Sequence, residues 1–95
     1  NGLLACGVQN KSKGFSIWKA MAASLNPEME KVGVNMVWAG CNPDESQVFM
    51  VVEMQDPSQM KTFGEREDVA KARADAGADV ASTTIISPIG EDWLP

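Results

Sequence analysis

Two polar side chains inside apolar stretches are the residues best suited to do chemistry. Glu53 is the one charged residue in the run Val48–Met54. A carboxylate shielded on a half-buried strand can act as a general base. Asn35 interrupts a second apolar run, and a buried amide can stabilise an oxyanion. The alternatives are a solvated or lysine-paired carboxylate at Glu53 and a solvent-facing or bulge-satisfying amide at Asn35. Both are candidate catalytic residues.

Aromatic and methionine side chains are the candidates for binding a ligand. Trp18 and Trp38 could line a pocket between a sheet and its helices and stack on a planar compound. Met36 and Phe49 are further candidates for binding a ligand, because methionine and aromatic side chains adapt to apolar ligands. The alternative is core packing, which the helical spacing of Phe15 and Trp18 also fits.

Missing residue types exclude several chemistries. The chain has no histidine and no tyrosine, so histidine acid–base catalysis, Ser-His-Asp triads and histidine metal sites are impossible. Two cysteines, Cys6 and Cys41, are too few for a disulfide framework and are interpreted as buried free thiols. We therefore expect no cofactor and no metal.

The charge balance restricts the partners. The net charge is −5, and the 8 basic residues are scattered along the chain. No basic stripe could neutralise a phosphate backbone, and an acidic chain is repelled by anionic membranes. No apolar run approaches the ~20 residues that span a bilayer, and no signal peptide is visible. We expect no nucleic-acid partner, no membrane and a cytoplasmic location, although a removed leader stays open because the chain starts at Asn1.

Periodicity and turn residues place the candidate residues on four strands and two helical regions. The strands are expected at Gly2–Val8, Val34–Ala39, Gln47–Gln55 and Val80–Ile89. The first helical region is expected as Phe15–Leu25, followed by a separate segment Asn26–Lys31 that Asn26 caps and Pro27 opens.

The second helical region begins at Asp56-Pro57-Ser58, a cap followed by proline. Gly64 is expected to break or bend it, and Glu65–Ala76 continues as a helix. The order β-α-β-β-α-β predicts one α+β domain over residues 1–95. Its fold is ferredoxin-like (βαββαβ), with a four-stranded antiparallel sheet, strand order 4-1-3-2 and both helical regions on one face.

The expected third strand is apolar on both faces. Val48, Met50, Val52 and Met54 alternate with Phe49 and Val51. The second strand is expected to carry Val34, Met36 and Trp38 on one side and Val37 and Ala39 on the other. Helices cover one face only, so the other needs a cover, and the same face of a second copy supplies one. A homodimer is predicted; the alternative is a ligand-binding surface on a monomer.

The order of the elements, the interrupted first helical region and the run VFMVVEMQDPSQM at Val48–Met60 resemble the dimeric α+β barrel proteins. That group includes the antibiotic-biosynthesis monooxygenases and an uncharacterised bacterial subfamily. The resemblance implies a dimeric α+β barrel and a pocket for a small apolar or aromatic ligand. The histidines that some members use for haem or proton transfer are absent from this chain.

Two functions follow as hypotheses. One is a small-molecule-binding protein or a cofactor-independent enzyme, such as a monooxygenase or isomerase acting on a planar compound. The other is a structural or regulatory dimer without catalysis, because every residue singled out also has a packing explanation.

Overall fold

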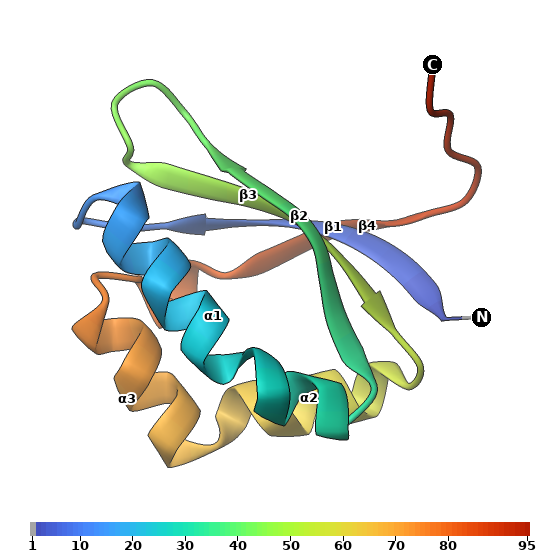
Figure 1. Ribbon diagram of the computed structural model, residues 1–95, viewed down its shortest axis with the longest axis horizontal. Helices are drawn as coiled ribbons and strands as arrows, with labels where there is room; N and C mark the ends of the chain where they lie inside the picture. The colour runs from blue at the N-terminus through green and yellow to red at the C-terminus, as the bar shows by residue number, and fades with distance from the viewer. Residues whose placement is uncertain (1) are drawn as a thin grey trace.

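A four-stranded antiparallel sheet and three α-helices make up the computed structural model, which describes residues 2–95. The strands are β1 (Leu3–Asn10), β2 (Val34–Cys41), β3 (Gln47–Met54) and β4 (Thr84–Ile89). The helices are α1 (Phe15–Lys31), α2 (Pro57–Glu65) and α3 (Glu67–Asp75), and a 3-10 turn, η1 (Val80–Ser82), precedes β4. The helices lie together on one face of the sheet (Figure 1).

The strand order is β2-β3-β1-β4, which confirms the predicted order 4-1-3-2. The element order, β-α-β-β-α-α-β, is roughly ferredoxin-like, with the second helical region divided in two. No helix within the described residues is long and apolar enough to cross a membrane. The predicted start of the last strand at Val80 is wrong, because residues 80–82 form the 3-10 turn.

The predicted interruption of the first helical region is also wrong. Helix α1 runs without a break through Pro27, and its axis bends in its second half (Figure 1). Asn26 does not cap a new helix, because its Nδ2 donates to Glu30 Oε1 at 3.0 Å within the same one. Proline in a helix interior costs about 3 kcal/mol and bends the axis. Pro27 is exposed, whereas Met29 in the following turn is buried in the core. The free energy gained by burying Met29 offsets the cost of a proline inside the helix.

The break between α2 and α3 falls two residues later than predicted. Gly64 stays helical, and Arg66 has the extended backbone that separates the two helices. The Arg66 guanidinium donates to both carboxylate oxygens of Asp68, at 3.1 and 2.7 Å. This hydrogen bonding raises the pKa of Arg66 and lowers that of Asp68. The start of α2 is confirmed, since Asp56 caps it and Pro57 opens it.

The two faces of β3 are as predicted. Val48, Met50, Val52 and Met54 are buried under the helices, and the residues between them point to the opposite face, which we call the outer face. The buried side contains two apolar clusters. One surrounds Val34, Val52 and Val69, and the other surrounds Trp18, Val48 and Met50.

The predicted faces of β2 are wrong beyond Met36. A bulge places Met36 opposite Val52 but Trp38 opposite Val51, so Val37 is an extra residue without a partner in the register. Directly opposed residues share a face, and one extra residue exchanges the faces of everything that follows. Ala39 therefore packs beneath the sheet, and Trp38 lies on the outer face.

Candidate functional site

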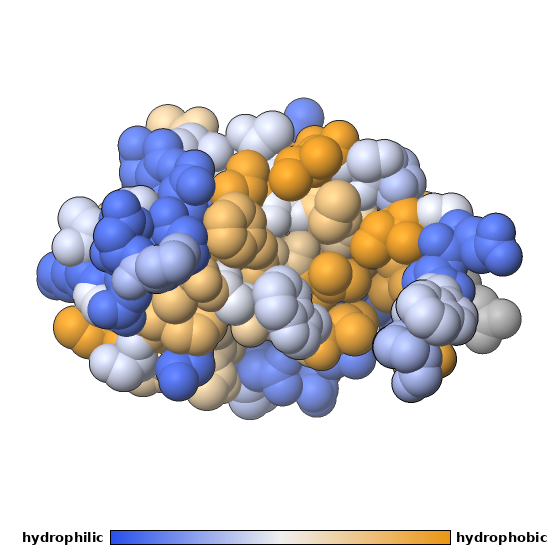
Figure 2. Space-filling model, turned by 90° about the horizontal axis from the view of Figure 1, so that it is seen from above, coloured by the Kyte–Doolittle hydropathy of each residue, from blue (hydrophilic) through white to orange (hydrophobic). Residues whose placement is uncertain are grey.

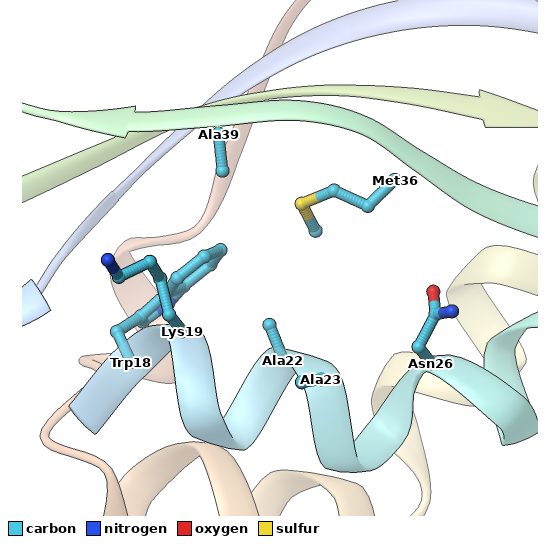
Figure 3. A pocket seen from close by; sticks show the side chains of 7 residues that line it. All are labelled: Trp18, Lys19, Ala22, Ala23, Asn26, Met36 and Ala39. Atoms are coloured by element: carbon cyan, nitrogen blue, oxygen red, sulfur yellow. The ribbon is translucent and has the colours of Figure 1, made fainter. Parts of the chain in front are cut away.

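A cavity of about 290 Å³ lies between α1 and β2. Figure 3 shows side chains from the helix below and the strand above around it, with the Lys19 ammonium directed away from its centre. The lining residues are Trp18, Lys19, Ala22, Ala23, Asn26, Met36 and Ala39. We call this cavity the α1–β2 pocket.

Small side chains create the α1–β2 pocket. Ala22 and Ala23 form its floor on α1, and Ala39 stands opposite on β2 (Figure 3). A leucine at any of these positions would extend into the space between helix and strand. Met36 and the Trp18 indole, which is stacked on Phe15 with ring centroids 5.8 Å apart, form the larger walls. The result is an apolar slot bounded by a sulfur atom and an aromatic ring.

The Trp18 indole is held in place by a buried hydrogen bond. Its Nε1 donates to Gln9 Oε1 at 3.2 Å, and Gln9 is only 2% exposed. Gln9 Nε2 in turn donates to Thr83 Oγ1 at 2.5 Å. Arg73 Nη2 donates to the same hydroxyl oxygen at 2.6 Å. This polar chain connects α1, β1, the segment before β4 and α3, and it fixes one wall of the pocket.

Arg73 contributes a half-buried positive charge to that chain. Burial lowers the pKa of its guanidinium. None of the ion pairs within residues 2–95 includes it. The group still keeps its charge at any ordinary pH, since a guanidinium loses its proton only in strong base.

Polar groups stand at the two ends of the α1–β2 pocket. Lys19 and Asn26 lie seven residues apart on α1, which is about 10 Å along a helix axis. The Lys19 ammonium is 5.1 Å from the Phe15 ring centroid, and no ion pair within the described residues includes it. Asn26 uses its Nδ2 on Glu30 and keeps Oδ1 as an acceptor. The ends therefore differ, with a cation at one and an amide oxygen at the other.

The structure divides the residues predicted from the sequence between two faces. Trp18 and Met36 line the α1–β2 pocket. Trp38, Phe49, Asn35 and Glu53 belong to the outer face, where Asn35 is the direct register partner of Glu53. The two candidate catalytic residues are thus close to each other but on the opposite side of the sheet from the pocket. They cannot act on a ligand bound there.

The outer face is a second feature of functional interest. Its apolar residues are Leu4, Cys6, Val8, Trp38, Phe49, Val51 and Ile89. Trp38 is 56% exposed and Phe49 is 36% exposed. The Trp38 ring lies against Gly40, where an added Cβ would come within 2.6 Å of the indole. Seen from the sheet side, apolar residues form a band across the middle of the molecule (Figure 2).

Other polar groups of the described residues lie apart from the α1–β2 pocket. A second, more polar hollow of about 390 Å³ is lined in part by Lys11 and Asp79. Lys11 is 5% exposed, and its Nζ donates to the backbone oxygens of Lys13 and Glu45. Both cysteines are free thiols. No cluster of three or more metal-ligating side chains occurs within residues 2–95.

Sequence reasoning missed several residues of the α1–β2 pocket. Ala22, Ala23 and Ala39 have no chemical signal, because they contribute by leaving space. Lys19 and Asn26 look like ordinary residues of a solvated helix surface. Gln9, which holds the Trp18 wall, lies beyond the predicted first strand Gly2–Val8, whereas β1 continues to Asn10. Extending the strand alternation by two residues, to Asn10, places Gln9 on the same face as Ala5.

A scan against models of known protein families finds no match, and a search of curated proteins finds no significant similarity. The resemblance to the dimeric α+β barrel proteins therefore stays a prediction.

Proposed function

We propose that this protein is a homodimeric small-molecule-binding protein of the dimeric α+β barrel type, which holds a planar apolar ligand in the α1–β2 pocket. The observation that carries the proposal is the pocket itself. Its walls are apolar, its volume is about 290 Å³, and one wall is an indole fixed by a buried hydrogen bond. Ligand sites are concave and mostly apolar, with a few placed polar groups.

Binding is supported better than catalysis. Among the lining residues there is no carboxylate, thiol or hydroxyl group. Lys19 is the one ionisable group there, and it is solvent-exposed. A reaction that removes a proton needs a base within hydrogen-bonding reach of the substrate. Glu53, the predicted base, lies on the other side of the sheet.

The homodimer is supported by the outer face. Its apolar residues are contiguous across β2, β3 and β1, and Glu53 is the one charged residue among the outward positions of these strands. The net charge of −5 therefore resides mainly on other surfaces. An apolar face with a single charged residue suits an identical face, since burying unpaired charge is costly and interface cores are depleted of charge. Two-fold pairing of the sheets would cover Trp38 and Phe49.

The pocket is tested by titrating the protein with benzamide, a neutral single-ring compound, and following the indole N–H resonance of Trp18 by NMR. We expect a saturable shift with a Kd on the order of millimolar, as befits so small a ligand. Ala22→Leu fills the pocket and should abolish the shift. Ala20→Leu, on the exposed side of the same helix, is the matched control and should leave it unchanged. No saturable shift in the original protein, or the same shift in the Ala22→Leu variant, refutes binding at this site.

The dimer is tested by light scattering at micromolar concentration. We expect about twice the chain mass of 10.2 kDa. Val51→Lys puts a charge in the middle of the outer face and should give the monomer mass, whereas Ala20→Lys on α1 should not. A single-chain mass for the original protein across the accessible concentration range ends the proposal of a dimer.

The structural or regulatory dimer is the second candidate function. The outer face favours it, because that face needs a cover whether or not the α1–β2 pocket binds anything. Dimerisation without any ligand response would support this alternative.

A further inference from the structure

We infer that the ligand of the α1–β2 pocket is a single-ring aromatic anion, such as an aromatic carboxylate, with its charged group at Lys19. This inference rests on the proposed function and specifies its ligand class. The pocket combines a flat apolar slot with one cation at one end, and no other charged side chain lines it.

The size of the pocket favours a small ligand. A volume of about 290 Å³ lies just below the range of about 300–1,000 Å³ typical of ligand sites. We expect one aromatic ring with small substituents between the alanine floor and Met36. The ligand ring can also contact the Trp18 indole, which is stacked on Phe15.

The charge at the pocket end sets the sign of the ligand. Lys19 has no carboxylate within 4 Å in the part of the chain that the structure describes. Its Nζ lies 5.1 Å from the centroid of the Phe15 ring, which stacks on Trp18, and the exposed side chain is free to turn toward a ligand at this end of the pocket. A carboxylate there gains a charge-assisted hydrogen bond. A cationic ligand would be repelled at the same place.

The polar group at the other end adds direction. Asn26 Oδ1 accepts hydrogen bonds, so it favours a donor such as a hydroxyl group on the ring position opposite the carboxylate. The helical separation of Lys19 and Asn26, about 10 Å, matches a ring substituted at both ends. The net charge of −5 does not override this local preference, because charges more than about 8 Å apart are largely screened at physiological salt.

The experiment compares benzoate with benzamide, two probes of nearly the same shape that differ in charge. Both are titrated into the original protein, Lys19→Gln, Lys19→Glu and the matched exposed variant Lys61→Gln, with the Trp18 indole resonance as the readout. We expect benzoate to bind roughly three- to fivefold more tightly than benzamide, as for a partly exposed ion pair. The preference should vanish in Lys19→Gln, reverse in Lys19→Glu and persist in Lys61→Gln.

Several outcomes would overturn the inference. Equal affinity for the two probes in the original protein does so, and so does a benzoate preference that survives both Lys19 substitutions. These failures differ from failure of the proposed function, in which neither probe binds or Ala22→Leu has no effect. Raising the salt concentration should weaken benzoate binding and leave benzamide binding unchanged.

Discussion

The indole N–H of Trp18 donates to the side-chain oxygen of Gln9 at 3.2 Å, and this bond joins the first turn of α1 to the central strand β1. Both side chains are buried. The bond satisfies a polar tryptophan atom within an apolar cluster and gives one wall of the α1–β2 pocket a defined orientation.

Gln9→Leu should destabilise the protein by about 2 kcal/mol. The substitution leaves the Trp18 N–H buried without an acceptor and removes a donor from Thr83. Urea unfolding followed by circular dichroism measures the change. Gln59→Leu, an exposed position on α2, should stay within about 0.5 kcal/mol of the original protein. Equal stability of the two variants would show that the Trp18–Gln9 bond contributes nothing.

Thr83→Val should destabilise the protein more than the small change in side-chain shape suggests. The Thr83 hydroxyl oxygen accepts from both Gln9 and Arg73, so valine leaves two donors without their acceptor. We expect a loss of about 2 kcal/mol in the free energy of unfolding. Thr83→Ser keeps the oxygen and should recover most of that loss. If serine and valine cost the same, the two hydrogen bonds to the Thr83 hydroxyl do not account for the effect of valine.

A hydrogen bond to Glu45 connects the start of α1 to the loop between β2 and β3. Glu45 Oε1 accepts from the backbone N–H of Phe15 at 2.9 Å, and the Glu45 backbone is left-handed, with φ of 60°. Glu45→Ala removes an N-terminal cap and should cost about 1 kcal/mol. Glu45→Gln keeps an acceptor and should be close to the original protein.

Glu45→Gly separates the cap from the backbone strain. Glycine loses the same hydrogen bond but adopts positive φ freely, which recovers about 1 kcal/mol of left-handed strain. It should therefore be more stable than Glu45→Ala in thermal unfolding. The reverse order would mean that the left-handed conformation carries no cost here.

Acid should lower the free energy of unfolding by protonating Asp56, the N-terminal cap of α2. The hydroxyl and backbone N–H of Ser58 donate to Asp56 at 2.7 and 2.9 Å, and these bonds hold the pKa of Asp56 below its ordinary value of 3.8. A lowered folded-state pKa stabilises the fold above the ordinary value, and that contribution is lost as pH falls through the lowered one. The free energy of unfolding should thus decline below about pH 4.

Asp56→Asn tests this dependence. Asparagine retains an oxygen that accepts from Ser58, so stability at pH 7 should change little. Its amide does not titrate, so the decline in the free energy of unfolding below about pH 4 should become shallower. Asp92→Asn in the exposed tail is the control and should keep the original slope. A slope unaltered in Asp56→Asn would contradict the proposed origin.

Local pattern was sufficient for much of the fold. Alternation along Val48–Met54 identified a strand with two apolar faces, and the Asp56-Pro57 pair identified the start of a helix. Both signals arise from contacts within a few residues. The strand order followed from the handedness of two crossovers, which is a property of any right-twisted sheet.

The amino-acid sequence by itself determined the four strands, their order in the sheet and the two-sided apolarity of β3. Tertiary structure alone decided the site. The bulge at Val37 changes which face receives Trp38 and Ala39, and it depends on pairing with β3. Burial of Met29 carries α1 through Pro27. The α1–β2 pocket exists because alanines from a helix and a strand face each other. A hydrophobic pattern of period 2 or 3.6 indicates the direction of a side chain but not its distance from the element that lies opposite.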